Sequence, residues 1–217
     1  MRKITKEELN TAIESHALWL NSNKSAGKRA ILTGVDLTCA DLTGANLTCA
    51  DLTYAKLHRA NLTDANLTGA YLNGVNLTWA YLIDADLTGA NLTYAKLVGA
   101  NLTGAILTGA KLVCANLTGA YLTGANLTYA KLVWANLTYA KLVWANLSCA
   151  DLTGAKLVWA NLTGADFIDA ILTGAKLVCA NLTGAYLTGA NLTYADLIDA
   201  NLTDANLTRA IRDEVAK

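Results

Sequence analysis

A single five-residue pattern of apolar and polar positions runs through nearly the whole chain. Leu recurs at every fifth position from Leu32 to Leu207, and Ala stands two positions before it, so that residues 30–209 form 36 consecutive pentapeptides. Phe167 replaces the central Leu once, and Val35 and Val75 replace Ala. This period is neither the 3.6 residues of an α-helix nor the alternation of a long strand.

Within each pentapeptide, Ala and Leu are two residues apart, and they therefore share one side of an extended segment. The residues just before and just after Leu, mostly polar and then Thr or Val, face the other way. The fifth residue is most often Gly, with Tyr, Trp, Cys and Asp as alternatives, and it marks the place where the chain turns. We expect a very short strand followed by a corner. Coils of such units bury Ala and Leu and pair their backbones with the coils on either side.

Residues 1–29 lack this pattern and predict one amphipathic helix over residues 6–21. Thr5 and Glu8 have the spacing of a capping box. The apolar stripe at helical spacing consists of Leu9, Ala12, Ile13, His16, Trp19 and Leu20. We expect this helix to cover one end of the array, with His16 and Trp19 packed in the contact.

Residues 210–217 provide a short C-terminal cap or tail, with Ile211 and Val215 as its only large apolar side chains. Such a small cover leaves core residues without neighbours, and solenoid ends require covers. A homodimer through the C-terminal end is therefore a possible arrangement.

The pentapeptides Ala45-Asn-Leu-Thr-Cys49 and Ala150-Asp-Leu-Thr-Gly154 resemble the Ala-(Asp/Asn)-Leu-x-x motif of the pentapeptide-repeat family. The resemblance covers residues 30–209. It implies an all-β solenoid, namely a right-handed quadrilateral β-helix with four pentapeptides per coil and about nine coils. The N-terminal helix is similar to the α-helical cap of some members. The spacing by itself does not distinguish four sides from three.

Composition argues against catalysis and against a membrane span. Seventeen basic residues balance seventeen acidic ones, and no apolar run is long enough to cross a bilayer. The five Cys all occupy corner positions, and neither His has partners at a metal-ligand spacing. We expect no enzyme activity, no cofactor and no metal, free thiols in the cytoplasm, and contact with neither nucleic acid nor membrane.

Four successive corner positions in the later half of the array are aromatic: Tyr129, Trp134, Tyr139 and Trp144. On a four-sided coil they occupy all four corners of one coil, and the next Trp is expected to stack over Tyr139. The candidate contact for an unidentified protein partner comprises these four residues together with Trp159, Lys131, Lys141 and Lys156. The alternative, which we favour, is corner packing with Lys stems lying along the rings.

The leading functional hypothesis is a non-catalytic structural scaffold or protein-interaction rod. The family resemblance also raises DNA mimicry that protects gyrase or topoisomerase, although outward Lys residues oppose the negative surface this requires. A third hypothesis is ice binding through ranks of Thr, for which Thr is otherwise a common exposed strand residue. Residues 105–130 recur identically as 170–195, an offset of 65 that moves the copied surface onto the next face of a four-sided rod. This displacement suggests that no single face was strictly maintained.

Overall fold

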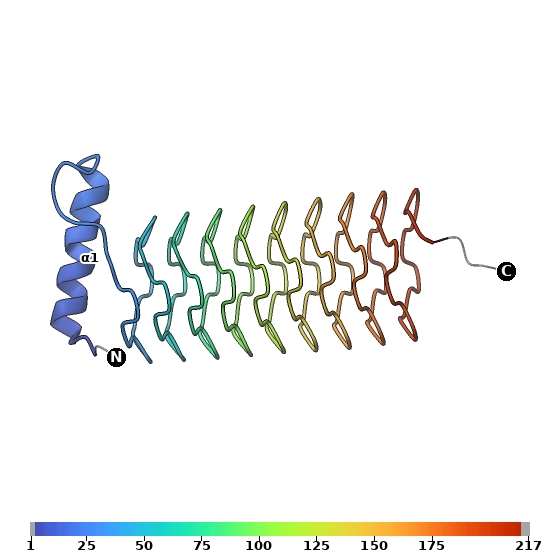
Figure 1. Ribbon diagram of the computed structural model, residues 1–217, viewed down its shortest axis with the longest axis horizontal. Coiled ribbons are helices and arrows are strands. Elements are labelled where there is room, and N and C mark those ends of the chain that lie inside the picture. The colour runs from blue at the N-terminus through green and yellow to red at the C-terminus, as the bar shows by residue number, and fades with distance from the viewer. Residues whose placement is uncertain (1–2, 214–217) are drawn as a thin grey trace.

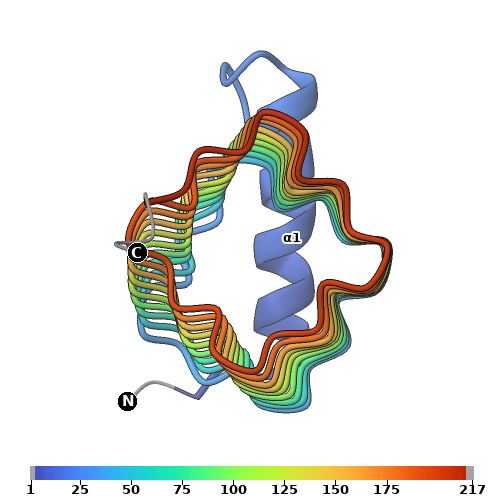
Figure 2. The same ribbon diagram turned by 90° about the vertical axis from the view of Figure 1, so that its right-hand side faces the viewer.

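The computed structural model describes residues 3–213, which form a rod of stacked coils with one helix across its first end (Figure 1). Between coils, backbone pairing joins residues twenty positions apart and in parallel, as in Ile31 with Asp51, and Lys3, which precedes the helix, pairs with Asp36. Nine such steps lead from Ile31 to Ile211. Since twenty residues are four pentapeptides, each coil has four sides (Figure 2). The expected quadrilateral β-helix is confirmed, while its right-handedness stays a prediction.

Hydrogen bonds explain why one pentapeptide makes one side. In the unit that begins at Ala125, Asn126 N–H donates to the previous coil at Ala105 O (2.9 Å), and Leu127 N–H donates to the next coil at Asn146 O (2.7 Å). Ala130 N–H then closes a turn onto Leu127 O (2.9 Å), with Tyr129 in the left-handed region at φ +59°. A positive φ at the third residue is typical of a type II turn. The extended part is so short that residues 3–213 contain isolated β-bridges and no longer strand.

The core consists of the Ala and Leu positions, as the pattern predicts. Central Leu side chains from Leu47 to Leu172 are completely buried, and so is Phe167. Val35 and Val75 fill their Ala positions without becoming exposed. The five-residue period therefore identifies the inward side of every coil.

Helix α1 spans Lys6–Asn21 and crosses the first coil (Figure 2). Thr5 caps it, because its side chain accepts from Glu8 N–H (3.1 Å) while the Glu8 carboxylate accepts from Thr5 N–H (2.9 Å), which confirms the capping box. Leu9 and His16 are buried against the rod, and Ile13 packs beside them. Within residues 3–213, no helix is long and apolar enough to cross a membrane.

The two ends of the described rod differ in how well the core is covered. Under α1, Leu32, Leu37 and Leu42 are as deeply buried as leucines in the middle. In the last coil, the central residues Leu197, Leu202 and Leu207 are only partly buried. Ile211 pairs with Asn191 and is exposed, and Val215 lies outside the described residues.

Candidate interaction surface

The corners of the coil hold the exposed aromatic side chains in a defined way. Every corner residue from Gly34 to Arg209 has a positive φ, which costs a residue with a side chain more than it costs Gly. A Cβ added at Gly154 would meet the ring of Trp134, and one added at Gly164 would meet the ring of Trp144. Each Trp therefore lies along the rod, across the Gly corner of the next coil.

These corner Trp rings pack on the next coil and are also exposed to solvent. Trp134 is 65% exposed, although one part of its ring covers Gly154. The other corner aromatics of the predicted contact are also more than half exposed. Ring packing on the next coil is therefore present at Trp134 and Trp144, while packing of Lys stems along these rings stays a prediction. More than half of each ring remains exposed.

The four-sided coil distributes the predicted contact over different sides of the rod. Tyr129, Trp134, Tyr139 and Trp144 stand on four separate corners of one coil. Trp159 is on the same corner as Tyr139, one coil further along. The predicted stacking of these two rings is not seen, because the one close ring pair within residues 3–213 is His16 with Trp19.

The three lysines are similarly separated. Lys131, Lys141 and Lys156 belong to three different columns of paired residues. The Lys141 ammonium lies 4.4 Å from the ring centre of Tyr121, which is a cation–π contact. Of the eight predicted residues, those that border one common side are Trp134, Tyr139, Lys156 and Trp159.

A surface groove of about 500 Å³, which the sequence did not predict, lies at the side of the rod next to the one that Trp134, Tyr139, Lys156 and Trp159 border. It is lined by Arg59, Trp79 and Gly99, which share one corner of the rod, and by Tyr81 and Tyr121 of the neighbouring side. The signal was present in the sequence, because Tyr81 and Tyr121 are forty residues apart and thus two coils apart in one column.

Most Asn and Asp side chains before Leu are engaged in the coil itself. Asn136 Oδ1 accepts from Thr138 N–H (3.0 Å) and from the Thr138 hydroxyl (2.7 Å), and Asp151 does the same with Thr153. Such local bonds to the backbone stabilise turns. The recurrent Asn-Leu-Thr thus has a structural role, and many of its Thr hydroxyls, such as that of Thr138, donate to the preceding Asn.

The His and Cys side chains of the described residues have structural surroundings. Residues 3–213 hold no cluster of three or more His, Cys, Asp or Glu side chains that could bind a metal. The five Cys are free. His16 is buried, its Nδ1 accepts from Ala30 N–H (3.1 Å), and burial lowers its pKa below the usual 6.5. Its role is structural, in the contact between α1 and the rod.

Comparison with known proteins agrees with this architecture. Eight copies of the family model "Pentapeptide repeats" match segments that together extend over residues 30–211. HetL from the cyanobacterium Nostoc sp. strain PCC 7120, a pentapeptide repeat protein involved in heterocyst differentiation regulation, is 37% identical over 96% of this chain and 97% of its own, with a TM-score of 0.43. Rfr23 from Cyanothece 51142 is 40% identical over 45% of this chain and 64% of its own, with a TM-score of 0.34.

A third solved structure is more distant. QnrB1, a plasmid-mediated fluoroquinolone resistance protein, is 20% identical over 86% of this chain and 91% of its own, with a TM-score of 0.45. No match was found among curated proteins.

Proposed function

Because the chain belongs to the pentapeptide-repeat family, we propose that it acts as a non-catalytic rod that contacts other proteins. The observation that carries this proposal is the state of the corner rings. Trp134 and Trp144 each rest on a Gly of the next coil and remain more than half exposed. A ring that is already held in place loses little freedom when a partner covers it, and Trp is enriched among the residues that dominate binding energy.

The relative HetL supports a role of this kind. Its involvement in the regulation of heterocyst differentiation is a regulatory function, and it is similar to this chain over nearly the full length of both. A rod with a rigid backbone and changeable corners suits recognition, because coils that form nearest-neighbour contacts tolerate changes in their outward residues.

A capture experiment with immobilised protein tests the proposal. The wild type should retain defined partners from a lysate of the source organism. Because Trp134 and Trp144 stand on different corners, Trp134→Ala or Trp144→Ala should reduce at least tenfold the retention of the partner that contacts that corner. Thr103→Ala, a change at an outward position without an aromatic ring, serves as the control. If the two Trp variants retain the same proteins in the same amounts as the wild type, the corner rings are not the contact.

We also propose that two copies associate through their C-terminal ends. The half-buried Leu197, Leu202 and Leu207 would become covered by the same residues of a second copy, as solenoid ends require. Sedimentation over a hundredfold range of concentration should show a monomer–dimer equilibrium that Leu202→Lys shifts toward the monomer. A monomer at all concentrations would rule out this association.

Two other functions have less support. Protection of gyrase by DNA mimicry requires a strongly negative surface, whereas exposed Lys96, Lys131 and Lys156 interrupt it here. A gyrase supercoiling assay with and without a quinolone distinguishes this function, since our proposal expects no effect. Ice binding through a rank of Thr is opposed by the breaks in that rank, where Ser148 and Ile168 replace Thr, and unchanged ice-crystal shape is the expected result.

A further inference from the structure

One side of the rod carries a row of lysines, although the net charge of the chain is zero. Backbone pairing places Lys56, Lys96, Lys156 and Lys176 in a single column, separated only by Asn residues. We call this side the Lys face. It consists of the pentapeptides 55–59, 75–79, 95–99, 115–119, 135–139, 155–159 and 175–179.

Charge on the Lys face is of one sign, while the same side of the rod ends in Asp36 next to Lys56 and in Asp196 next to Lys176. Its seven pentapeptides contain the four lysines and Arg59, and they contain no Asp or Glu. All five cations are exposed, and none forms an ion pair within 4.0 Å in the described part of the chain. On the opposite side, residues 65–69 and every equivalent unit through 185–189 contain Asp86, Asp166 and Asp169 but no cation. Over these coils, the two opposite sides therefore differ in charge, whereas each of the two sides between them carries both signs.

The exposed aromatic corners gather at the edges of the same face. Nine corners of the array are Tyr or Trp, and six of them border the Lys face. One edge carries Tyr54, Tyr94 and Trp134, and the other carries Trp79, Tyr139 and Trp159. All six are more than half exposed. Between the two edges, the outward positions beside the lysines include Val98, Val158 and Val178.

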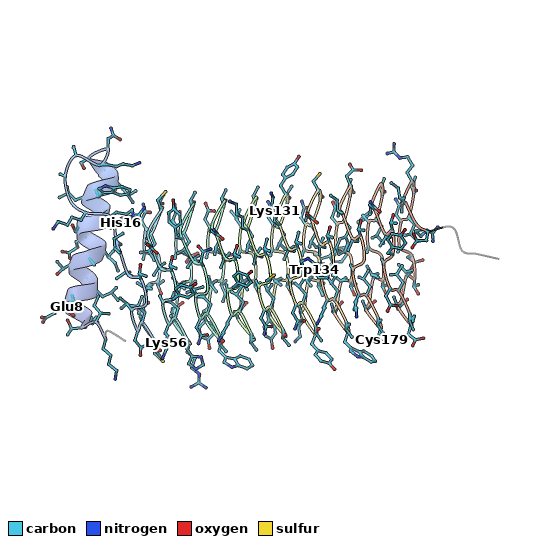
Figure 3. The ribbon with its side chains drawn as sticks, in the orientation of Figure 1. Glu8, His16, Lys56, Lys131, Trp134 and Cys179 are labelled. Atoms are coloured by element: carbon cyan, nitrogen blue, oxygen red, sulfur yellow. The ribbon has the colours of Figure 1, made fainter. Side chains whose placement is uncertain are left out.

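The Lys face is also straight, because the coils stack in register along the rod (Figure 1). Lys56 and the corner residue Cys179 lie along the same lower side, near opposite ends (Figure 3). Six coils separate Lys56 from Lys176, which is about 29 Å at the usual spacing of about 4.8 Å between strands.

We propose that the Lys face docks on an anionic lipid bilayer, with the rod lying flat on the membrane surface. Lysines near a membrane are attracted by anionic headgroups, and Trp and Tyr favour the boundary between headgroups and acyl chains. A plane can contact both aromatic edges and the lysines between them at the same time. Peripheral docking needs neither a membrane-spanning segment nor a net positive charge, which were the grounds for expecting no membrane contact.

A nucleic acid fits this surface less well. Single strands follow a positively charged groove and stack their bases on rings within it, whereas these rings form two rows on either side of a flat face. In a duplex, the bases are stacked on one another and are not available to the rings. The Lys face shares Trp134 with the protein contact proposed above, whereas Trp144 stands on another corner, and vesicle binding is measured without any protein partner.

Co-sedimentation of the full chain with vesicles tests the proposal. Vesicles of phosphatidylcholine with one quarter phosphatidylserine should bind the wild type at 0.1 M salt, and vesicles of phosphatidylcholine alone should not. Each Lys near the surface contributes about a fivefold change in binding, so Lys96→Gln/Lys156→Gln/Lys176→Gln should weaken binding about 100-fold.

The matched control removes the same charge from other faces. Lys111→Gln/Lys131→Gln/Lys141→Gln should change binding less than threefold, and thermal melts should show that both triple variants are folded. Absence of binding to the anionic vesicles, or equal loss in both triple variants, would overturn the proposal. Binding to a single-stranded oligonucleotide without binding to vesicles would assign the face to nucleic acid instead.

Discussion

Replacement of Gly154 by Ala tests whether the corner rings are held by the next coil. Gly154 and Gly174 stand on the same corner of adjacent coils, with nearly equal φ of +65° and +64°. A left-handed Ala costs about 1 kcal/mol at either position. The difference lies in the surroundings, because a Cβ at Gly154 meets the Trp134 ring, whereas a Cβ at Gly174 meets nothing within 4 Å.

The size of the difference follows from the part of Trp134 that is covered. A Trp side chain offers up to about 250 Å², and Trp134 is 65% exposed, so about 90 Å² is in contact with the rod. At about 25 cal/mol per Å², that contact contributes ~2 kcal/mol. Since a displaced ring keeps some contacts, Gly154→Ala should destabilise the protein by about 1–2 kcal/mol more than Gly174→Ala.

Urea unfolding of the two variants measures this difference, and Trp fluorescence reports the movement of the ring. In a Trp134→Ala background, Gly154→Ala should cost no more than Gly174→Ala, which a double-mutant cycle reveals. Equal costs of the two Gly substitutions in the wild-type background would refute the claim that Trp134 rests on the next coil.

Three other changes probe the cap, the core and the outward polar residues. Burial lowers the pKa of His16, so as the pH falls the unfolded chain takes up a proton before the folded protein does, and stability falls below about pH 6.5. The Tm should therefore decrease from pH 7.5 to 5.5 in the wild type and much less in His16→Gln. A wild-type Tm that is constant over this range would contradict the structural role of buried His16. Leu127→Ala should cost about 2–5 kcal/mol in urea unfolding, and Leu202→Ala clearly less because that side chain is only partly buried; equal losses would show that the last coil is covered in solution. Asn136→Ala should lower the free energy of unfolding by about 1 kcal/mol, whereas Asn136→Asp keeps the acceptor oxygen and should lower it little. Similar losses of Tm in the two variants would contradict this expectation.

The structure changes how the aromatic belt around Tyr129 and Trp144 is understood. The sequence places these residues at successive corners, and the four-sided coil directs them to four different sides. Residues that are adjacent in the pattern are therefore separated on the surface. Conversely, Trp134 and Lys156 belong to different coils of the chain and border the same face.

The sequence by itself determined which residues are inside. Ala and Leu recur at fixed positions, and which residues of a pentapeptide face inward depends only on that pentapeptide, so the core and the corners could be predicted. The capping box of α1 could also be predicted, because it depends on residues that are close in the sequence. The number of sides, the Gly contacts of the rings and the gathering of four lysines on one side were decided only by the tertiary structure. They depend on which residues lie twenty positions apart in the sequence. This separation is set by the hydrogen bonds between neighbouring coils, such as that from Leu127 N–H to Asn146 O, which make each coil four pentapeptides long. A five-residue period contains no information about that closure, because every pentapeptide presents the same inward pair whichever side it occupies.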